Sequence, residues 1–220
     1  MHIAEGFLPP IWCLFWFLVA IPFVVWGARN VAKIFRERPE QKLVLAVSGA
    51  FIFVLSSLHI PSVTGSSSHP TGTGLSVILY GPATTSLLSA IVLIFQALLL
   101  AHGGLTTLGA NIFSMGIAGP TAGFLTFRIL RFLKARLAIQ VFSTAVVADL
   151  VTYVITALQL AVVYPSASGG IMGSFTTFLG IFLITQIPLA IVEGILFIIF
   201  FDYLKRSRPK LVVQILGDKT

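Results

Sequence analysis

The sequence predicts an all-α fold, a polytopic membrane helical bundle of about seven crossings with one short or broken helix. Only 10% of the 220 residues are charged and the mean hydropathy is +1.01, which excludes an ordinary soluble globule. Long uncharged runs approach the roughly 20 apolar residues that a spanning helix needs. The basic residues are gathered between these runs. Together these features are typical of a multi-pass membrane protein.

The apolar runs predict the helices in order. The first, Ile11 to Ala28, contains no charged residue, and the second is Leu43 to Leu58. Between Thr73 and Pro82 the apolar stretch is too short to span a membrane alone, so we predict a short or broken helix there. The remaining spans are expected at residues 83–101, 110–127, 137–163 and 175–203.

Lysine and arginine predict the orientation of these spans. The 14 basic residues fall in four places, at residues 29–42, 128–136, 205–210 and 219. The positive-inside rule assigns these segments to the cytoplasm, which places the N-terminus outside the cell membrane and the C-terminus inside. Residues 73–82 must then make a crossing, because the chain has to be inside before residue 83. A basic charge distributed in this way fits a lipid bilayer, and we expect no nucleic-acid partner.

Other features limit the organisation of the chain. No charge run or Pro-rich linker divides it, so we expect one integral-membrane domain over residues 1–220. The single cysteine, Cys13, excludes an internal disulfide and a thiolate metal cluster. No basic region precedes the first apolar run, so we expect the N-terminus to be retained rather than cleaved as a secretory signal.

The N-terminus carries a candidate metal site. The amine of Met1, the backbone nitrogen of His2 and Nδ1 of its ring can reach one ion through unstrained chelate rings. Three coplanar nitrogens leave one corner of a square open, a geometry that suits Ni(II) or Cu(II) and that Co(II) can accept. The fourth donor must come from elsewhere in the chain.

The chain has four histidines, and His69 is the candidate for the fourth donor. It lies in a polar segment, residues 66–74, that we expect at the external surface after the second span. His59 and His102 stand at the ends of predicted spans, where placement at the membrane interface accounts for them. Three polar residues are candidates to hold the ligands or a water, namely Ser66, Ser68 and Asn111.

Three segments resemble one known family. They are Met-His-Ile-Ala-Glu-Gly-Phe-Leu at residues 1–8, Ser-Ser-Ser-His-Pro-Thr-Gly-Thr-Gly at residues 66–74 and Leu-Thr-Thr-Leu-Gly-Ala-Asn at residues 105–111. They resemble the CbiM/NikM family, the substrate-capturing membrane subunits of energy-coupling-factor transporters for cobalt and nickel. The resemblance implies Co(II) or Ni(II) as the transported ion, with no resident cofactor. It also implies a transmembrane coupling subunit, a cytoplasmic ATPase pair and a small accessory membrane protein as partners.

Two alternatives come from polar residues in the predicted spans. Ser68 and His69 are too close in sequence to form a nucleophile–base pair, and Asp149 lies near mid-membrane, so an enzyme is not expected. The chain also lacks a phosphate-binding loop and needs partners to use ATP. Asp149 and Glu193 leave open a self-sufficient secondary metal transporter with a proton relay. By topology neither acid is expected near the external site. The choice between cobalt and nickel also stays open.

Overall fold

The computed structural model describes residues 2–61, 67–207, 209 and 212–213. In this part of the chain, six helical segments are long and apolar enough to cross a membrane. In order, the elements are α1 (Pro10–Glu37), η1 (Pro39–Gln41), α2 (Lys42–Ser57), β1 (Ile60–Pro61), β2 (Ser67–Ser68), α3 (Thr73–Leu99), α4 (Leu108–Asn111), η2 (Ile112–Ala118), α5 (Gly119–Phe132), α6 (Leu137–Val163) and α7 (Gly170–Ser207). The predicted all-α bundle is confirmed.

The outer surface of the bundle is apolar. On α1, Leu18 and Trp26 are 61% and 55% exposed, and on α7, Ile184 and Ile199 are 77% and 61% exposed. A water-soluble protein does not present a continuous apolar surface of this kind. Polar side chains are buried instead, among them Thr85 of α3, Asp149 of α6 and Glu193 of α7. The chain is therefore a multi-pass membrane protein whose polar groups face the interior of the bundle.

The predicted broken helix lies in α3, at Gly81. This glycine has φ 78° and ψ 172°, a conformation that residues other than glycine rarely adopt, and Pro82 follows it. The side chains of Ser76 and Thr85 share a 2.5 Å hydrogen bond across the break. In a continuous helix these residues would be about 14 Å apart, so the chain reverses direction at Gly81. The short arm, residues 73–80, is the segment for which the charge distribution predicts a short crossing.

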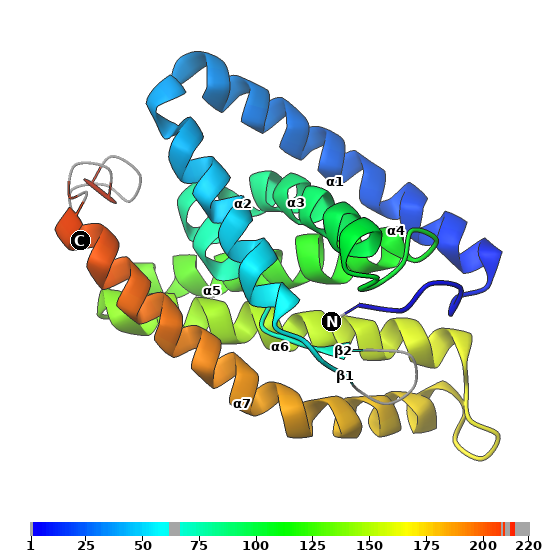
Figure 1. Cartoon of the computed structure of the whole chain (residues 1–220). Coiled ribbons are helices and arrows are strands. Elements are labelled where there is room, and N and C mark those ends of the chain that lie inside the picture. Colours follow the sequence, from blue (N-terminus) through cyan, green and yellow to red (C-terminus); the bar gives the residue numbers. More distant parts are fainter. Residues whose placement is uncertain (1, 62–66, 208, 210–211, 214–220) are drawn as a thin grey trace.

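The two ends of the bundle differ in composition. We call the end with the α1–α2, α5–α6 and C-terminal segments the basic end, because the lysines and arginines of the described residues lie there. We call the opposite end, which carries the start of α1, residues 100–107 and the α6–α7 connection, the histidine end. In Figure 1 the basic end is on the left and the histidine end on the right. The N-terminal segment, residues 2–9, runs inward from the start of α1 toward β2 (Figure 1).

The segment after β2 is deeper than the sequence predicts. Strand β1 pairs antiparallel with β2, with Ile60 opposite Ser68. From there the chain enters the bundle, and His69, Thr71 and Thr73 have no exposed surface. The expectation of a surface loop is therefore wrong for residues 67–73. Polar groups of α6 and α7 satisfy the backbone of this segment, which makes its burial possible.

Candidate metal centre

All four histidines lie in one continuous series of ring contacts. The ring centroids of His59 and His102 are 4.1 Å apart, those of His102 and His2 are 4.1 Å apart, and those of His2 and His69 are 4.5 Å apart. His59 is exposed, whereas His102, His2 and His69 are 4%, 2% and 0% exposed. One ring nitrogen from each of the three buried histidines lies within 4.8 Å of the others. The structure thus brings His2 and His69 together, as the sequence predicts, and adds His102.

The two rings of the predicted site face each other through defined nitrogens. Nδ1 of His69 lies 2.9 Å from the carbonyl oxygen of Pro70. A carbonyl can only accept, so Nδ1 carries the proton and Nε2 of the neutral ring has a free lone pair. Nδ1 of His2 lies 2.6 Å from this Nε2. Nδ1 of His2 is the ring nitrogen that can bind a metal ion together with the backbone nitrogen of the same residue. This same Nδ1 faces His69.

Burial keeps these imidazoles neutral. It holds the pKa of His2 well below the usual 6.5, and the neighbouring His69 and His102 rings lower that pKa further. Burial likewise holds the pKa of His69 well below 6.5. The pKa of His102 is lowered to about 3, first by burial and then by the nearby His59 ring. A metal ion needs the unprotonated form of each ligand, so the rings are in the state that binds metal at neutral pH.

The segment that carries His2 is held through the backbone of the next residue. Asn111, at the end of α4, accepts a 2.7 Å hydrogen bond from the Ile3 nitrogen and donates a 3.1 Å bond to the Ile3 oxygen. Thr107 also donates to the Ile3 oxygen, at 2.7 Å. The sequence predicts Asn111 as a residue that holds a ligand in place. In the structure its hydrogen bonds go to the backbone beside His2 and to the Thr107 hydroxyl.

Residues 104–106 hold the same segment further from the site. Glu5 accepts a 3.2 Å hydrogen bond from the backbone nitrogen of Thr106. Hydrogen bonding by the Thr106 side chain, and then by this backbone nitrogen, lowers the pKa of the Glu5 carboxyl group. The Gly6 nitrogen donates to the Thr106 hydroxyl at 3.1 Å. A Cβ atom on Gly104 would lie 2.5 Å from the Cα of Glu5. The close approach of the two backbones therefore requires glycine at position 104.

The backbone of His69 is fixed from α6 and α7. The Tyr153 hydroxyl accepts a 2.9 Å hydrogen bond from the His69 nitrogen and donates a 3.1 Å bond to the His69 oxygen. Gln186 also donates to the His69 oxygen, at 3.2 Å, and its amide contacts Asp149. All four residues are fully buried. These bonds leave the His69 ring little freedom to move along the bundle.

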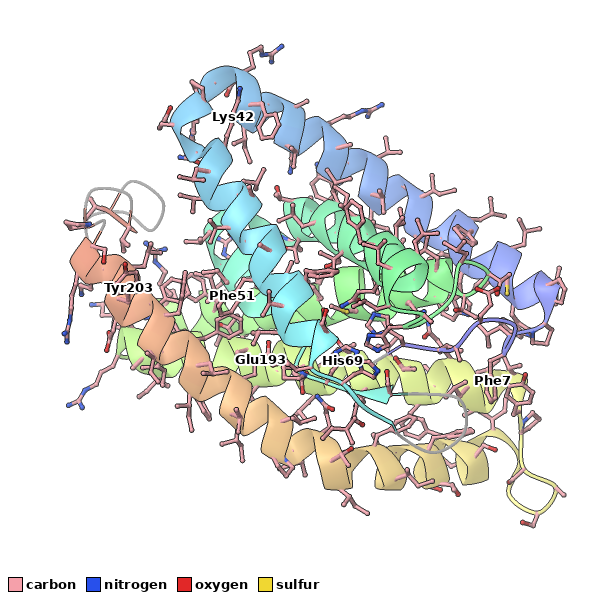
Figure 2. The ribbon with its side chains drawn as sticks, viewed as in Figure 1. Phe7, Lys42, Phe51, His69, Glu193 and Tyr203 are labelled. Carbon is pink, nitrogen blue, oxygen red and sulfur yellow. The ribbon has the colours of Figure 1, made fainter. Side chains whose placement is uncertain are left out.

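Glu193 of α7 holds the residues that follow His69. Its carboxylate accepts hydrogen bonds from the backbone nitrogens of Thr71 and Gly72, at 2.6 and 2.9 Å, and from the Thr71 hydroxyl at 3.1 Å. In Figure 2 the labelled His69 and Glu193 side chains lie close together in the middle of the bundle. The expectation that both intramembrane acids lie away from the site is wrong, because the His69 segment enters the bundle to meet them.

Other residues predicted for the site have different positions. Met1 and Ser66 lie outside the described residues. The Ser68 hydroxyl shares a 2.8 Å hydrogen bond with the hydroxyl of Thr185 and fixes β2 to α7. Its neighbour Ser67 contacts a ring, through a 2.7 Å hydrogen bond to Nε2 of His102.

His102 is the residue that sequence reasoning missed. A histidine at the end of a span is explained by the interface alone, and that explanation conceals its contact with His2. The two glycines that follow His102, Gly103 and Gly104, are the sequence feature that could have indicated a close approach of another segment to this turn. A Cβ atom on Gly103 would lie 3.1 Å from Cδ2 of His2, so small residues at this turn permit the approach of the N-terminal segment.

Comparison with known proteins shows which family the chain resembles. The family described as "Cobalt uptake substrate-specific transmembrane region" (CbiM) matches residues 2–211. A cobalt transport protein CbiM of Acetoanaerobium sticklandii is 57% identical over 204 residues, which cover 93% of this chain and 84% of that protein. The CbiM of Chlorobium limicola is 56% identical over 211 residues, covering 96% and 83%.

Solved structures show the same fold. A crystal structure of a transition metal transporter has a TM-score of 0.83 at 24% identity and covers 100% of this chain and 99% of its own. A truncated transition metal transporter has a TM-score of 0.81 at 25% identity, covering 94% and 99%. The chain therefore belongs to the CbiM family and is a membrane component of transport rather than an enzyme.

Proposed function

We propose that this chain captures a divalent transition metal, Co(II) or Ni(II), at a site formed by the N-terminal residues and His69. The observation that carries the proposal is the 2.6 Å distance between Nδ1 of His2 and Nε2 of His69. Two nitrogens on adjacent corners of a square, each about 2 Å from a metal, lie about 2.8 Å apart. The two rings thus stand close to the spacing of one edge of a square-planar site.

The remaining donors come from the N-terminus itself. The backbone nitrogen of His2 and the amine of Met1 complete a set of four nitrogens when Nδ1 of His2 and Nε2 of His69 take the other corners. All four donors are neutral or deprotonated nitrogens, the set that suits Ni(II) and that Co(II) accepts. The proposal needs no carboxylate ligand. Glu5 supports this reading, because its carboxylate is engaged with Thr106.

Cobalt is favoured over nickel by the relatives and not by the donor set. The curated relatives are named as cobalt transport proteins. By the Irving–Williams order the same nitrogens bind Ni(II) more tightly than Co(II), so cobalt selectivity would have to come from geometry or metal availability. Titration of the purified protein with both ions in competition distinguishes the two substrates.

The orientation and the partners complete the proposal. The basic end faces the cytoplasm by the positive-inside rule, which places the histidine end and the N-terminus outside, where the ion arrives. We propose that the chain works as the substrate-capturing subunit of an energy-coupling-factor importer. A transmembrane coupling subunit, a cytoplasmic ATPase pair and a small accessory membrane protein would be its partners.

The alternative of a self-sufficient transporter is less well supported. A proton relay needs a carboxylate that is free to exchange protons along a path. Glu193 accepts three hydrogen bonds from the segment after His69, so its contacts support a role in positioning that segment. Metal uptake by this chain alone in vesicles, with a proton gradient and no ATPase, would favour the alternative.

The sharpest test of the proposed site changes the N-terminus. One residue added before Met1 turns its amine into an amide, a far poorer donor, and should abolish high-affinity binding of Ni(II) or Co(II) in a calorimetric titration. Acetylation of the amine adds little bulk and should do the same. A tag at the C-terminus should leave binding intact. Full affinity in the extended protein, at equal membrane level, would exclude the amine as a ligand.

A second variant tests the other side of the site. His69→Ala removes one corner of the square and should also abolish high-affinity binding, while the helical content of the protein stays unchanged by circular dichroism. If His69→Ala binds as tightly as the wild type, the ion is held elsewhere.

A further inference from the structure

His59 and His102 extend the series of rings from the surface to the proposed site. Exposure falls along the series, from exposed His59 to 4% for His102, 2% for His2 and 0% for His69. Successive ring centroids are 4.1, 4.1 and 4.5 Å apart. No other histidine is present in the chain. The His102 ring also lies 5.1 Å from the His69 ring, so His102 borders both rings of the proposed site and His59 lies outside it, toward the surface.

The polar contacts of His102 do not account for its burial. Its Nε2 shares a hydrogen bond with the Ser67 hydroxyl at 2.7 Å. Its Nδ1 is buried and has no hydrogen-bond partner among the described residues. Nine other buried polar atoms of the described residues also have no partner, so this nitrogen does not by itself indicate a function. It is a neutral imidazole nitrogen between the exposed His59 and the buried His2, where it can bind an ion in transit.

The stacking of His59 and His102 indicates transit and not storage. Their ring planes are inclined by only 23°. The lone pairs of an imidazole lie in the plane of its ring, so two nearly parallel rings direct their lone pairs side by side and cannot readily chelate one ion. Each ring can bind the ion singly, and single imidazole ligation is weaker than the four-nitrogen chelate. An ion bound there is free to move on.

We propose that His59 and His102 form an outer binding station through which the divalent ion reaches His2 and His69. The station rests on the proposed function, because it serves the same ion. The arriving ion carries water ligands that must be removed before it enters a buried site. Successive imidazole rings lie about 4 Å apart, so each ring can replace one water ligand as the ion moves from His59 to His102 and on to His2. The ion then keeps ligands throughout its path. The ring of His102, in contact with both His59 and His2, is the point of transfer.

This role predicts a kinetic effect distinct from that of a ligand. A residue on the route lowers the barrier for binding and for release equally, so its loss slows both rates and leaves the dissociation constant unchanged. A ligand of the final site instead stabilises the bound ion, so its loss raises the dissociation constant. A purely structural residue changes neither rate constant once the protein is folded.

The experiment uses the purified full chain in detergent with Ni(II) as the probe, followed by stopped-flow mixing and equilibrium titration. His102→Phe keeps a ring between its neighbours and removes the nitrogens. We expect the association and dissociation rate constants both to fall about tenfold, with the dissociation constant changed less than threefold. His59→Phe, at an exposed position, should show the same pattern to a smaller degree. Tyr203→Phe at the basic end is the control for loss of a polar atom from a ring.

The outcomes separate the station from the site. Unchanged rate constants in both His102→Phe and His59→Phe would overturn the station. A raised dissociation constant in His102→Phe, with an unchanged association rate constant, would also overturn it, because His102 would then be a ligand of the final site. If His102→Phe does not fold, His59→Phe decides. His69→Ala tests the proposed function separately. If it binds Ni(II) like the wild type, the proposed site fails, whatever the rates of the other variants.

Discussion

Replacement of Glu193 by glutamine tests whether the segment after His69 must be held for metal to bind. Glu193→Gln preserves the size of the side chain but removes its charge and replaces one acceptor oxygen by an NH2 group. Both oxygens of the wild-type carboxylate are used, by Thr71 and Gly72. In the variant at least one backbone N–H of this buried segment faces a donor instead of an acceptor.

The magnitude follows from the kind of hydrogen bond that is lost. Hydrogen bonds to a charged group contribute roughly 1.5–3 kcal/mol each, and those between neutral groups roughly 0.5–1.5 kcal/mol. Losing one bond and weakening the others loosens the segment by about 2–4 kcal/mol. Part of this reaches the His69 ring, and loss of a residue that orients a metal ligand typically weakens affinity about 10- to 100-fold. We expect a loss in this range for Ni(II) or Co(II).

The assay is calorimetric titration of the purified variant with either ion. Asp202→Asn is the matched control, because it makes the same carboxylate-to-amide change on the same helix at an exposed position. It should bind like the wild type. An affinity of Glu193→Gln within about twofold of the wild type would refute the positioning role. An equal loss in Asp202→Asn would mean that the effect is general to α7.

Two further predictions concern the N-terminal segment and pH. Gly104→Ala should weaken metal binding by more than about tenfold in the same titration, because its Cβ would lie 2.5 Å from the Cα of Glu5 and displace the segment that carries His2. Affinity equal to that of the wild type would show that the segment can shift without harm. Lower pH should destabilise the metal-free protein. The pKa of His102 is about 3 when folded and near 6.5 when unfolded, so below pH 6.5 the unfolded state takes up a proton that the folded state does not. Thermal unfolding should therefore shift to lower temperature from about pH 6.5 toward pH 3, and less steeply in His102→Phe. Equal slopes would contradict the prediction.

The fold could be predicted from the sequence because the membrane imposes simple rules. An apolar run of the right length must be a helix, and basic residues must gather on one side. These two rules also located the reversal in α3. The apolar stretch before Gly81 is too short to span a membrane alone, and placing both basic segments, 29–42 and 128–136, on the same side predicts an additional crossing there. The chain reverses at this glycine, where φ is 78°.

The depth of the His69 segment could not be predicted in this way. A run of serine, threonine and glycine is typical of a surface loop, and nothing local indicates burial. The segment is buried because its partners, Tyr153 and Glu193, lie 84 and 122 residues from the positions that they contact. Such pairings depend on how α6 and α7 pack, which hydropathy does not specify. His102 was missed for the same reason, because its contact with His2 depends on a turn far along the chain.

At the proposed site, an ion would bind without a carboxylate to carry protons away. His2 and His69 are carried by segments that are held independently, one by Asn111 and the other by Glu193. Without metal, the lone pair of His69 Nε2 faces Nδ1 of His2 at 2.6 Å, so that Nδ1 must carry a proton. An ion that binds between them requires Nδ1 to give up that proton, which can move to Nε2 of the same ring and leave the imidazole neutral. The proton change that accompanies ring ligation is therefore confined to His2, and the buried acids remain available to hold the segment after His69 in place.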